Sequence, residues 1–110
     1  DWPIKAVDAI YTANTLHIVS WPLVEAFFNA VSQHLNQQGK LCIYGPFNYQ
    51  GQYTSESNAG FDLWLKERDS ESAIRDIEAI IALAKNAGLL LADDHPMPAN
   101  NRLLIFNKVN

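Results

Sequence analysis

The chain has 110 residues, of which 48% are hydrophobic and 18% are charged, so it can form one packed domain and is too apolar to be disordered. Its formal net charge is -4 and its Lys and Arg residues form no cluster, which argues against a nucleic-acid partner. No apolar run approaches the ~18 residues of a membrane-spanning helix, so we expect no membrane span.

The first half of the chain predicts a strand, a helix and a second strand. Residues 7–13 read as the first strand, and residues 21–36 as a helix that Ser20 can cap and that Gly39 should end in a left-handed conformation. Residues 40–45, KLCIYG, form the second strand, and their unbroken apolar character predicts that both faces of the sheet are covered. One helix face is apolar at spacings of three and four: Val24, Phe27, Phe28, Val31 and Leu35.

The second half predicts a polar and aromatic loop over 46–57, helices over 58–66 and 74–87, and strands over 89–92 and 102–106. The segment DDHPMPANN between the last two strands is too short for a crossover helix, so they should pair antiparallel. Its end, MPANN, should form the hairpin turn, because Asn tolerates a left-handed backbone. This order predicts an α/β domain, the second half of a doubly wound sheet, whose ligands bind at the carboxyl ends of the parallel strands.

The chain offers few groups for metal or redox chemistry. Its single cysteine, Cys42, excludes an internal disulfide and suits the reducing cytoplasm. The histidines, His17, His34 and His95, lack the spacing of a metal-ligand set, and the five glycines are isolated rather than gathered in a phosphate-binding loop. We therefore expect no metal site and a cytoplasmic protein.

Polar side chains follow the first strand where an open α/β sheet places its ligand. His17 could accept a proton from a substrate, or it could bond the local backbone before the helix. Asn14 and Thr15 could contact a ligand or satisfy the turn. An aromatic loop follows the second strand, and its rings could form a substrate wall or pack over the adjacent helix: Phe47, Tyr49 and Tyr53.

Five segments, in their order and spacing, resemble the methyltransferase-like 26 family: ANTLHI, YGPF, TSESNAGFD, IRDIEAI and MPANN. That family, long catalogued as a domain of unknown function, is similar to class I methyltransferases that use S-adenosyl-L-methionine (SAM). The resemblance covers essentially all 110 residues, but it corresponds to the C-terminal half of the family's domain. Ala73 stands where the family often has Gly, which concerns only the start of the following helix.

The resemblance implies the C-terminal half of a Rossmann-like class I methyltransferase sheet, with residues 1–110 as a partial domain. The cofactor's glycine-rich turn and ribose-binding acid would lie in the absent N-terminal half. Asn14, Thr15 and Leu16 would border SAM, and His17 would be the catalytic base. The wall on the substrate side would comprise Tyr44, Phe47, Asn58 and Asp62.

Two functions remain open at this point. One is the substrate-side half of a SAM-dependent methyltransferase, inactive alone, with a small molecule or another group as methyl acceptor. The other is a noncatalytic α/β interaction module, and an upstream strand followed by a Gly-x-Gly turn would favour the enzyme. Because the 7–13 strand would lose a neighbour in a half domain, we also expect a homodimer or association with the N-terminal half.

Overall fold

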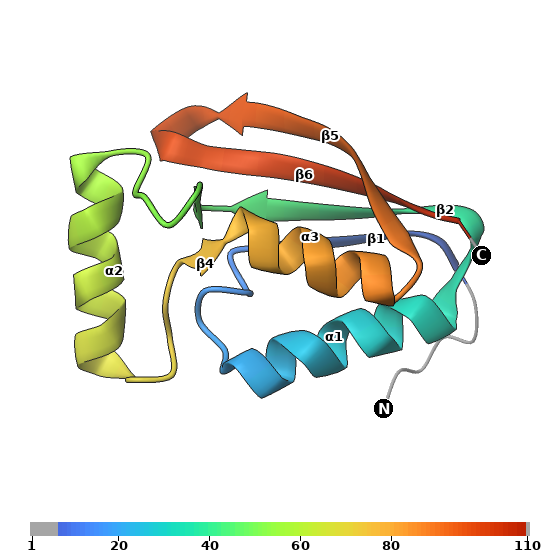
Figure 1. The fold of residues 1–110 in the computed structure, drawn as a ribbon, viewed down its shortest axis with the longest axis horizontal. Helices are drawn as coiled ribbons and strands as arrows, with labels where there is room; N and C mark the ends of the chain where they lie inside the picture. The colour runs from blue at the N-terminus through green and yellow to red at the C-terminus, as the bar shows by residue number, and fades with distance from the viewer. Residues whose placement is uncertain (1–6, 110) are drawn as a thin grey trace.

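The computed structural model describes residues 7–109 (Figure 1). Its longer strands and helices follow the expected order, but two short strands, Phe47–Asn48 and Arg75–Asp76, lie where a loop and the start of a helix were predicted. A short 3-10 turn, Pro98–Asn100, joins the last two strands. The elements are β1 Val7–Ala13, α1 Trp21–His34, β2 Leu35–Gly45, β3 Phe47–Asn48, α2 Glu56–Arg68, β4 Arg75–Asp76, α3 Ile77–Asn86, β5 Leu89–Met97 and β6 Asn101–Lys108.

The main sheet has the strand order β1-β2-β6-β5. β1 pairs parallel to β2 across the crossover helix α1, whereas β6 runs antiparallel to both β2 and β5. The predicted parallel pair and antiparallel hairpin are therefore confirmed. β3 and β4 form a separate two-stranded parallel sheet beside the carboxyl end of β2.

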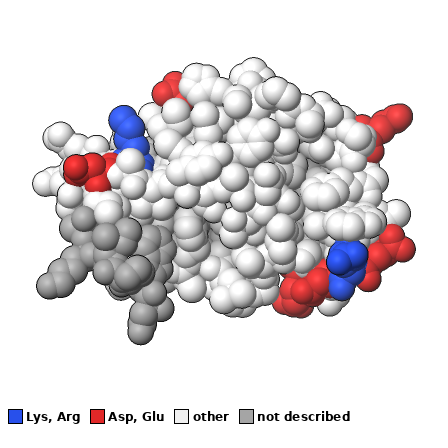
Figure 2. Space-filling model, turned by 180° about the vertical axis from the view of Figure 1, so that it is seen from behind, with Lys and Arg blue, Asp and Glu red and all other residues white. Residues whose placement is uncertain are grey.

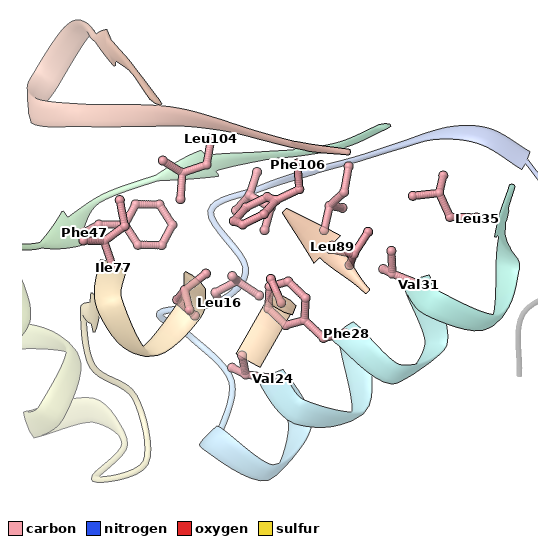
Figure 3. Close-up of a cluster of buried hydrophobic side chains, with 14 residues drawn as sticks. Leu16, Val24, Phe28, Val31, Leu35, Phe47, Ile77, Leu89, Leu104 and Phe106 are labelled. Carbon is pink, nitrogen blue, oxygen red and sulfur yellow. The ribbon is translucent and has the colours of Figure 1, made fainter. Parts of the chain in front are cut away.

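One hydrophobic core lies between the main sheet and the two helices α1 and α3, which pack on the same face (Figures 1 and 3). The ring of Phe28 on α1 meets that of Phe106 on β6 edge to face, with centroids 6.3 Å apart. Each such side chain gains about 1.5–3 kcal/mol from burial relative to exposure. The fully buried members include Val24, Phe28, Val31, Leu41, Ile80, Ala84, Leu89, Leu104 and Phe106.

The opposite face of the sheet carries no helix within the described residues. Tyr11, Cys42 and Ile105 lie in register across β1, β2 and β6 on this face, and Tyr11 is 65% exposed. The prediction that helices cover both faces of the sheet at residues 40–45 is thus wrong for residues 7–109, because α1 and α3 lie on the same face. The molecule seen from the side opposite to Figure 1 is nearly free of charged residues except near its margins (Figure 2).

The end of the first helix differs from the prediction. α1 stops at His34, and Leu35 takes an extended conformation that places its side chain in the core, where it is 2% exposed. Gln38, not Gly39, has the left-handed backbone, with φ 66°. Gly39 is required for space instead, since a β-carbon there would lie 2.7 Å from the carbonyl oxygen of Asn36 and from the Leu35 side chain.

Other boundaries also shift. Helix α3 begins at Ile77 rather than residue 74, because Arg75 and Asp76 pair with β3 as strand β4. Helix α2 is longer than predicted, and the Ser55 hydroxyl caps it by accepting the Asn58 N–H at 3.0 Å. Strand β5 extends to the turn, five residues beyond the predicted 89–92, and β6 is slightly longer than 102–106 at both ends. No helix of the described residues is long and apolar enough to cross a membrane.

The turn between β5 and β6 contains a strained alanine. Ala99 is exposed and has φ 62° and ψ 34°, a left-handed conformation that Asn100 shares with φ 61°. A β-carbon disfavours this region by roughly 1–2 kcal/mol, and glycine avoids the cost. Ala99→Gly should therefore raise the free energy of unfolding by about 1 kcal/mol in urea titrations. The matched change Ala82→Gly, exposed in α3, should lower it by a similar amount, and a loss at both sites would contradict the assignment.

Candidate functional site

A cleft of about 350 Å³ opens beside the carboxyl ends of β1 and β2, where the sequence predicts a ligand. Helix α2 and the turn between β5 and β6 complete its walls. Half of the lining residues are asparagine, and none has an ionisable side chain: Asn14, Pro46, Ser57, Asn58, Phe61, Ala99, Asn100 and Asn101. A larger hollow of about 500 Å³ lies at the other end of β2, away from every residue singled out from the sequence.

Asn14 faces this cleft because of an unusual backbone conformation. Its φ of 55° turns the chain away from β1, and its N–H donates to the Tyr44 carbonyl at 2.8 Å. Asparagine suits such left-handed positions because its short side chain bonds locally. Here the Asn14 side chain forms no hydrogen bond with the described residues, so its amide is available to a ligand.

The next two residues are used within the protein. The Thr12 hydroxyl donates to Thr15 Oγ1 at 2.9 Å, and Thr15 Oγ1 donates to the Ala13 carbonyl at 3.1 Å. Leu16 is 3% exposed and belongs to the core (Figure 3). Of the three residues expected beside the cofactor, the structure therefore brings only Asn14 to the cleft.

His17 lies next to the cleft, behind Phe61. It is 4% exposed, and its ring meets the Phe61 ring edge to face at a centroid distance of 5.6 Å. A β-carbon added at Gly45 would lie 3.6 Å from His17 Nδ1, so the imidazole packs over the end of β2. The imidazole forms no hydrogen bond with the described residues, in contrast to the alternative of a histidine that bonds the local backbone.

The backbone around His17 is held by a segment more than fifty residues later. Arg75 Nε donates to the Leu16 carbonyl at 3.1 Å, and its Nη2 donates to the Val19 carbonyl at 2.5 Å. The Ala73 N–H donates to the His17 carbonyl at 3.0 Å. These bonds satisfy a tight turn whose carbonyls would otherwise lack partners, and they fix the position of the imidazole.

Burial lowers the pKa of His17 below its ordinary value, and the nearby Arg75 cation lowers it further. Both effects disfavour the imidazolium. At neutral pH, His17 is therefore an uncharged imidazole that can accept a proton.

The lowered pKa has a consequence for stability. When the pH falls below 6.5, the ordinary value, the unfolded chain binds a proton at His17 before the folded chain does. The free energy of unfolding should thus decrease between pH 6.5 and 5, by up to about 1.4 kcal/mol per pH unit. Urea titrations of wild type and His17→Gln measure this slope, which the substitution should reduce. Asn29→Gln, at an exposed position on α1 without a titratable group, is the control and should leave the slope unchanged.

The four residues expected on the substrate side have different surroundings. Asn58 lines the cleft, and Tyr44 lies beside it, because its hydroxyl accepts from Asn101 Nδ2 at 3.3 Å. Phe47 is 2% exposed and packs in the core. Asp62 is 2% exposed and does not line the cleft.

The Asp62 carboxylate binds three groups of the protein itself. It accepts the Ile74 N–H at 2.9 Å and the Tyr53 hydroxyl at 2.5 Å, and it pairs with Lys66 at 3.0 Å. Burial by itself raises the pKa of Asp62, but these donors outweigh it and hold the pKa below the ordinary value. Asp62 therefore joins α2 to the loop before it and to the segment that holds His17.

The aromatic loop is anchored rather than free. The Tyr49 hydroxyl donates to Asp94 Oδ2 at 2.6 Å, and Arg102 binds the other oxygen of that carboxylate at 2.8 Å. Burial and the bond to Asp94 raise the pKa of Tyr49, so its hydroxyl stays protonated.

The contacts that join the β5–β6 turn to α2 escaped the sequence analysis, although Asn58 itself was predicted. Asn58 Nδ2 donates to the Asn100 carbonyl at 3.3 Å, and Asn100 Nδ2 lies 3.2 Å from Ser57 Oγ, so the β5–β6 turn folds onto α2. These partners are 42 and 43 residues apart, and no local pattern indicates their pairing. The motif IRDIEAI contains Arg75, but nothing in its spacing reveals that the guanidinium reaches the turn of His17.

The chain shares its fold with part of several solved proteins that are described as O-methyltransferases. An O-methyltransferase family 2 protein from Planctomyces limnophilus, crystallised with apigenin, matches with a TM-score of 0.86 and 22% identity over 97% of this chain and 32% of its own. An O-methyltransferase family protein from Burkholderia thailandensis matches with a TM-score of 0.81 and 17% identity, over 96% and 31%. The mitomycin 7-O-methyltransferase MmcR has a TM-score of 0.81 and 18% identity, over 96% and 31%.

The chain belongs to the family described as "Protein of unknown function (DUF938)", which matches residues 2–108. The resemblance to a methyltransferase-like family is thus confirmed at the level of fold. The narrower assignment to the methyltransferase-like 26 family goes beyond this match. The chain spans about a third of the length of the solved structures that it resembles, because the matched region makes up 31–32% of each of those chains.

Proposed function

We propose that this chain is the substrate-side part of a SAM-dependent methyltransferase. The observation that carries the proposal is the neutral imidazole of His17, which has no hydrogen-bond partner among residues 7–109 and is held beside a cleft at the carboxyl ends of β1 and β2. The methyltransferase fold, with solved O-methyltransferases among the similar structures, supports it. We also propose that the protein is related in function to the methyltransferase-like 26 family and that it is located in the cytoplasm.

The described residues fit SAM only in part. Asn14 presents a free amide at the cleft, but the Thr15 hydroxyl is bonded internally and Leu16 is in the core. One amide cannot replace the several polar contacts that an amino-acid group, a ribose and an adenine require. We therefore propose that residues 1–110 are a partial domain and that other parts of the whole protein hold most of the cofactor.

The part that this chain plays is proton transfer and positioning. When bound, SAM supplies a methyl group on a sulfonium centre, and alignment with the acceptor provides most of the rate. The imidazole of His17 takes the proton that a hydroxyl or amine acceptor must lose. Arg75 acts through His17 as a positioning residue, since it holds the Leu16 and Val19 carbonyls on either side.

Calorimetric titration with SAM tests the proposal. The 110-residue chain alone should bind SAM very weakly, whereas a protein extended upstream should bind it and transfer its methyl group. A micromolar dissociation constant for the chain alone would contradict the division into halves. Absence of methyl transfer by the extended protein, with any of a broad set of hydroxyl and amine acceptors, would favour the noncatalytic module.

We also propose that the free edge of β1 pairs with further chain. β1 is the outermost strand of the described sheet, and its exposed Tyr11 lies on the helix-free face in register with Cys42 and Ile105. An open strand with an apolar face favours pairing with another chain. The N-terminal half of the domain would pair there, and a second copy would take its place when that half is absent.

Light scattering at micromolar concentration should therefore show a particle of at least twice 12.3 kDa for the chain alone. Tyr11→Lys puts a charge beside the β1 edge and should shift the chain towards monomer. Leu63→Lys, at a 62% exposed position on α2, is the control and should leave the assembly intact. A monodisperse wild-type monomer would contradict the proposal.

A further inference from the structure

Two of the asparagines that line the cleft beside β1 and β2, Asn58 and Asn101, present hydrogen-bond acceptors to a ligand, whereas Asn14 presents a whole free amide. Asn58 Nδ2 uses its hydrogens on Thr54 Oγ1 at 3.0 Å and on the Asn100 carbonyl at 3.3 Å. Asn101 Nδ2 likewise donates to the Tyr44 hydroxyl at 3.3 Å and to the Pro98 carbonyl at 3.3 Å.

The orientation of both amides is determined by these partners. A backbone carbonyl only accepts hydrogen bonds, so the nitrogen of each amide must face it. The amide oxygens of Asn58 and Asn101 are then left without a partner among the described residues. Asn58 is 4% exposed and lines the cleft, so the cleft is where a donor for its unpartnered oxygen can enter.

No charged side chain lines the cleft, so an ionic ligand would find no opposite charge there. The nearest buried carboxylate, Asp62, is already paired with Lys66. A carboxylate ligand would lie against the amide oxygens of Asn58 and Asn101, and an ion of either sign would lose its hydration without an opposite charge. Pro46, Phe61 and Ala99 supply apolar walls, and about 350 Å³ accommodates a single-ring molecule.

We propose that this cleft binds an uncharged small molecule that donates hydrogen bonds through hydroxyl groups, with Asn58 and Asn101 as the residues that select it. This ligand class narrows the substrate of the proposed methyltransferase, and it rests on that proposed function only in identifying the ligand as the methyl acceptor. Binding itself depends on the cleft alone. The class of ligand is thus a phenol or a similar ring alcohol, and carboxylates are rejected.

Three probes of similar size test the selection on the ¹⁵N-labelled 110-residue chain by NMR titration. Resorcinol is uncharged and has two hydroxyl donors, 1,3-dimethoxybenzene keeps the ring without donors, and benzoate carries a negative charge. Resorcinol should shift the backbone signals of residues 57–61 and 99–101. The other two should bind about tenfold more weakly, as expected when a buried acceptor stays unpaired.

Asn58→Ala and Asn101→Ala should each weaken resorcinol binding about five- to tenfold. Asn29→Ala removes an exposed amide on α1 and is the matched control, with unchanged binding. Asn101 is half-buried at the start of β6, so its variant tests the idea even if Asn58→Ala fails to fold. Equal binding of benzoate and resorcinol, unchanged binding by Asn101→Ala, or no shift at these residues would overturn the proposal.

The outcomes separate this proposal from methyl transfer. If resorcinol binds as expected but the extended protein transfers no methyl group, the ligand class stands and the methyltransferase proposal fails. If the extended protein transfers a methyl group but the cleft shows none of this selectivity, the methyltransferase proposal stands and the ligand class is wrong.

Discussion

His17→Gln should reduce methyl transfer by the extended protein about 10²–10⁴-fold, the usual contribution of a positioned general base. Glutamine has a similar volume and polarity, but its amide does not accept a proton at neutral pH. The loss should appear in kcat, while SAM affinity stays close to wild type. With an acceptor whose hydroxyl is already ionised, the loss should be much smaller, because no proton has to be removed.

Two measurements distinguish this role from a structural one. His17→Gln should retain a cooperative unfolding transition, since Arg75 and Ser72 bind backbone carbonyls that the substitution leaves in place. His95→Gln on β5 should keep full turnover as the control. Wild-type turnover by His17→Gln, or equal losses for neutral and ionised acceptors, would exclude proton transfer by this residue.

Asp62→Ala should lower the free energy of unfolding by about 2–4 kcal/mol, the largest stability effect that we expect on α2. The change leaves the Ile74 N–H without its acceptor in a buried position and removes the partner of the Tyr53 hydroxyl. Urea titration measures the loss. Glu67→Ala, exposed on the same helix, should change stability by less than about 0.5 kcal/mol.

Asp62→Asn separates hydrogen bonding from charge. Its amide oxygen can still accept the Ile74 N–H, but the pair with Lys66 is lost, so the cost should be smaller than for alanine. Because the folded pKa of Asp62 is below the ordinary value of 3.8, its contribution is present above that pH and is lost as the pH falls through the folded value. A loss for Asp62→Ala no greater than for Glu67→Ala would show that the carboxylate does not join these segments.

Local sequence patterns predicted only some of the residues at the cleft. The polar run after β1 and the predicted parallel strands place Asn14 and His17 near a ligand, and the structure sets Asn14 in the cleft and His17 beside it. Thr15 and Leu16 belong to the same run, yet the fold uses them internally. Adjacent residues point in different directions once a turn is formed, and sequence proximity alone does not reveal which of them face a ligand.

Local sequence patterns were sufficient to predict the order of the longer elements, the parallel pair with its crossover helix, and the left-handed Asn100 in the closing turn. These features follow from apolar periodicity and short connections, which act between near neighbours in the chain. Two features became visible only in the folded chain: α1 and α3 share one face of the sheet, and Arg75 reaches back 59 residues to the Leu16 carbonyl. Such contacts depend on how complete elements pack, because their partners meet only when burial of the shared core has brought distant segments together.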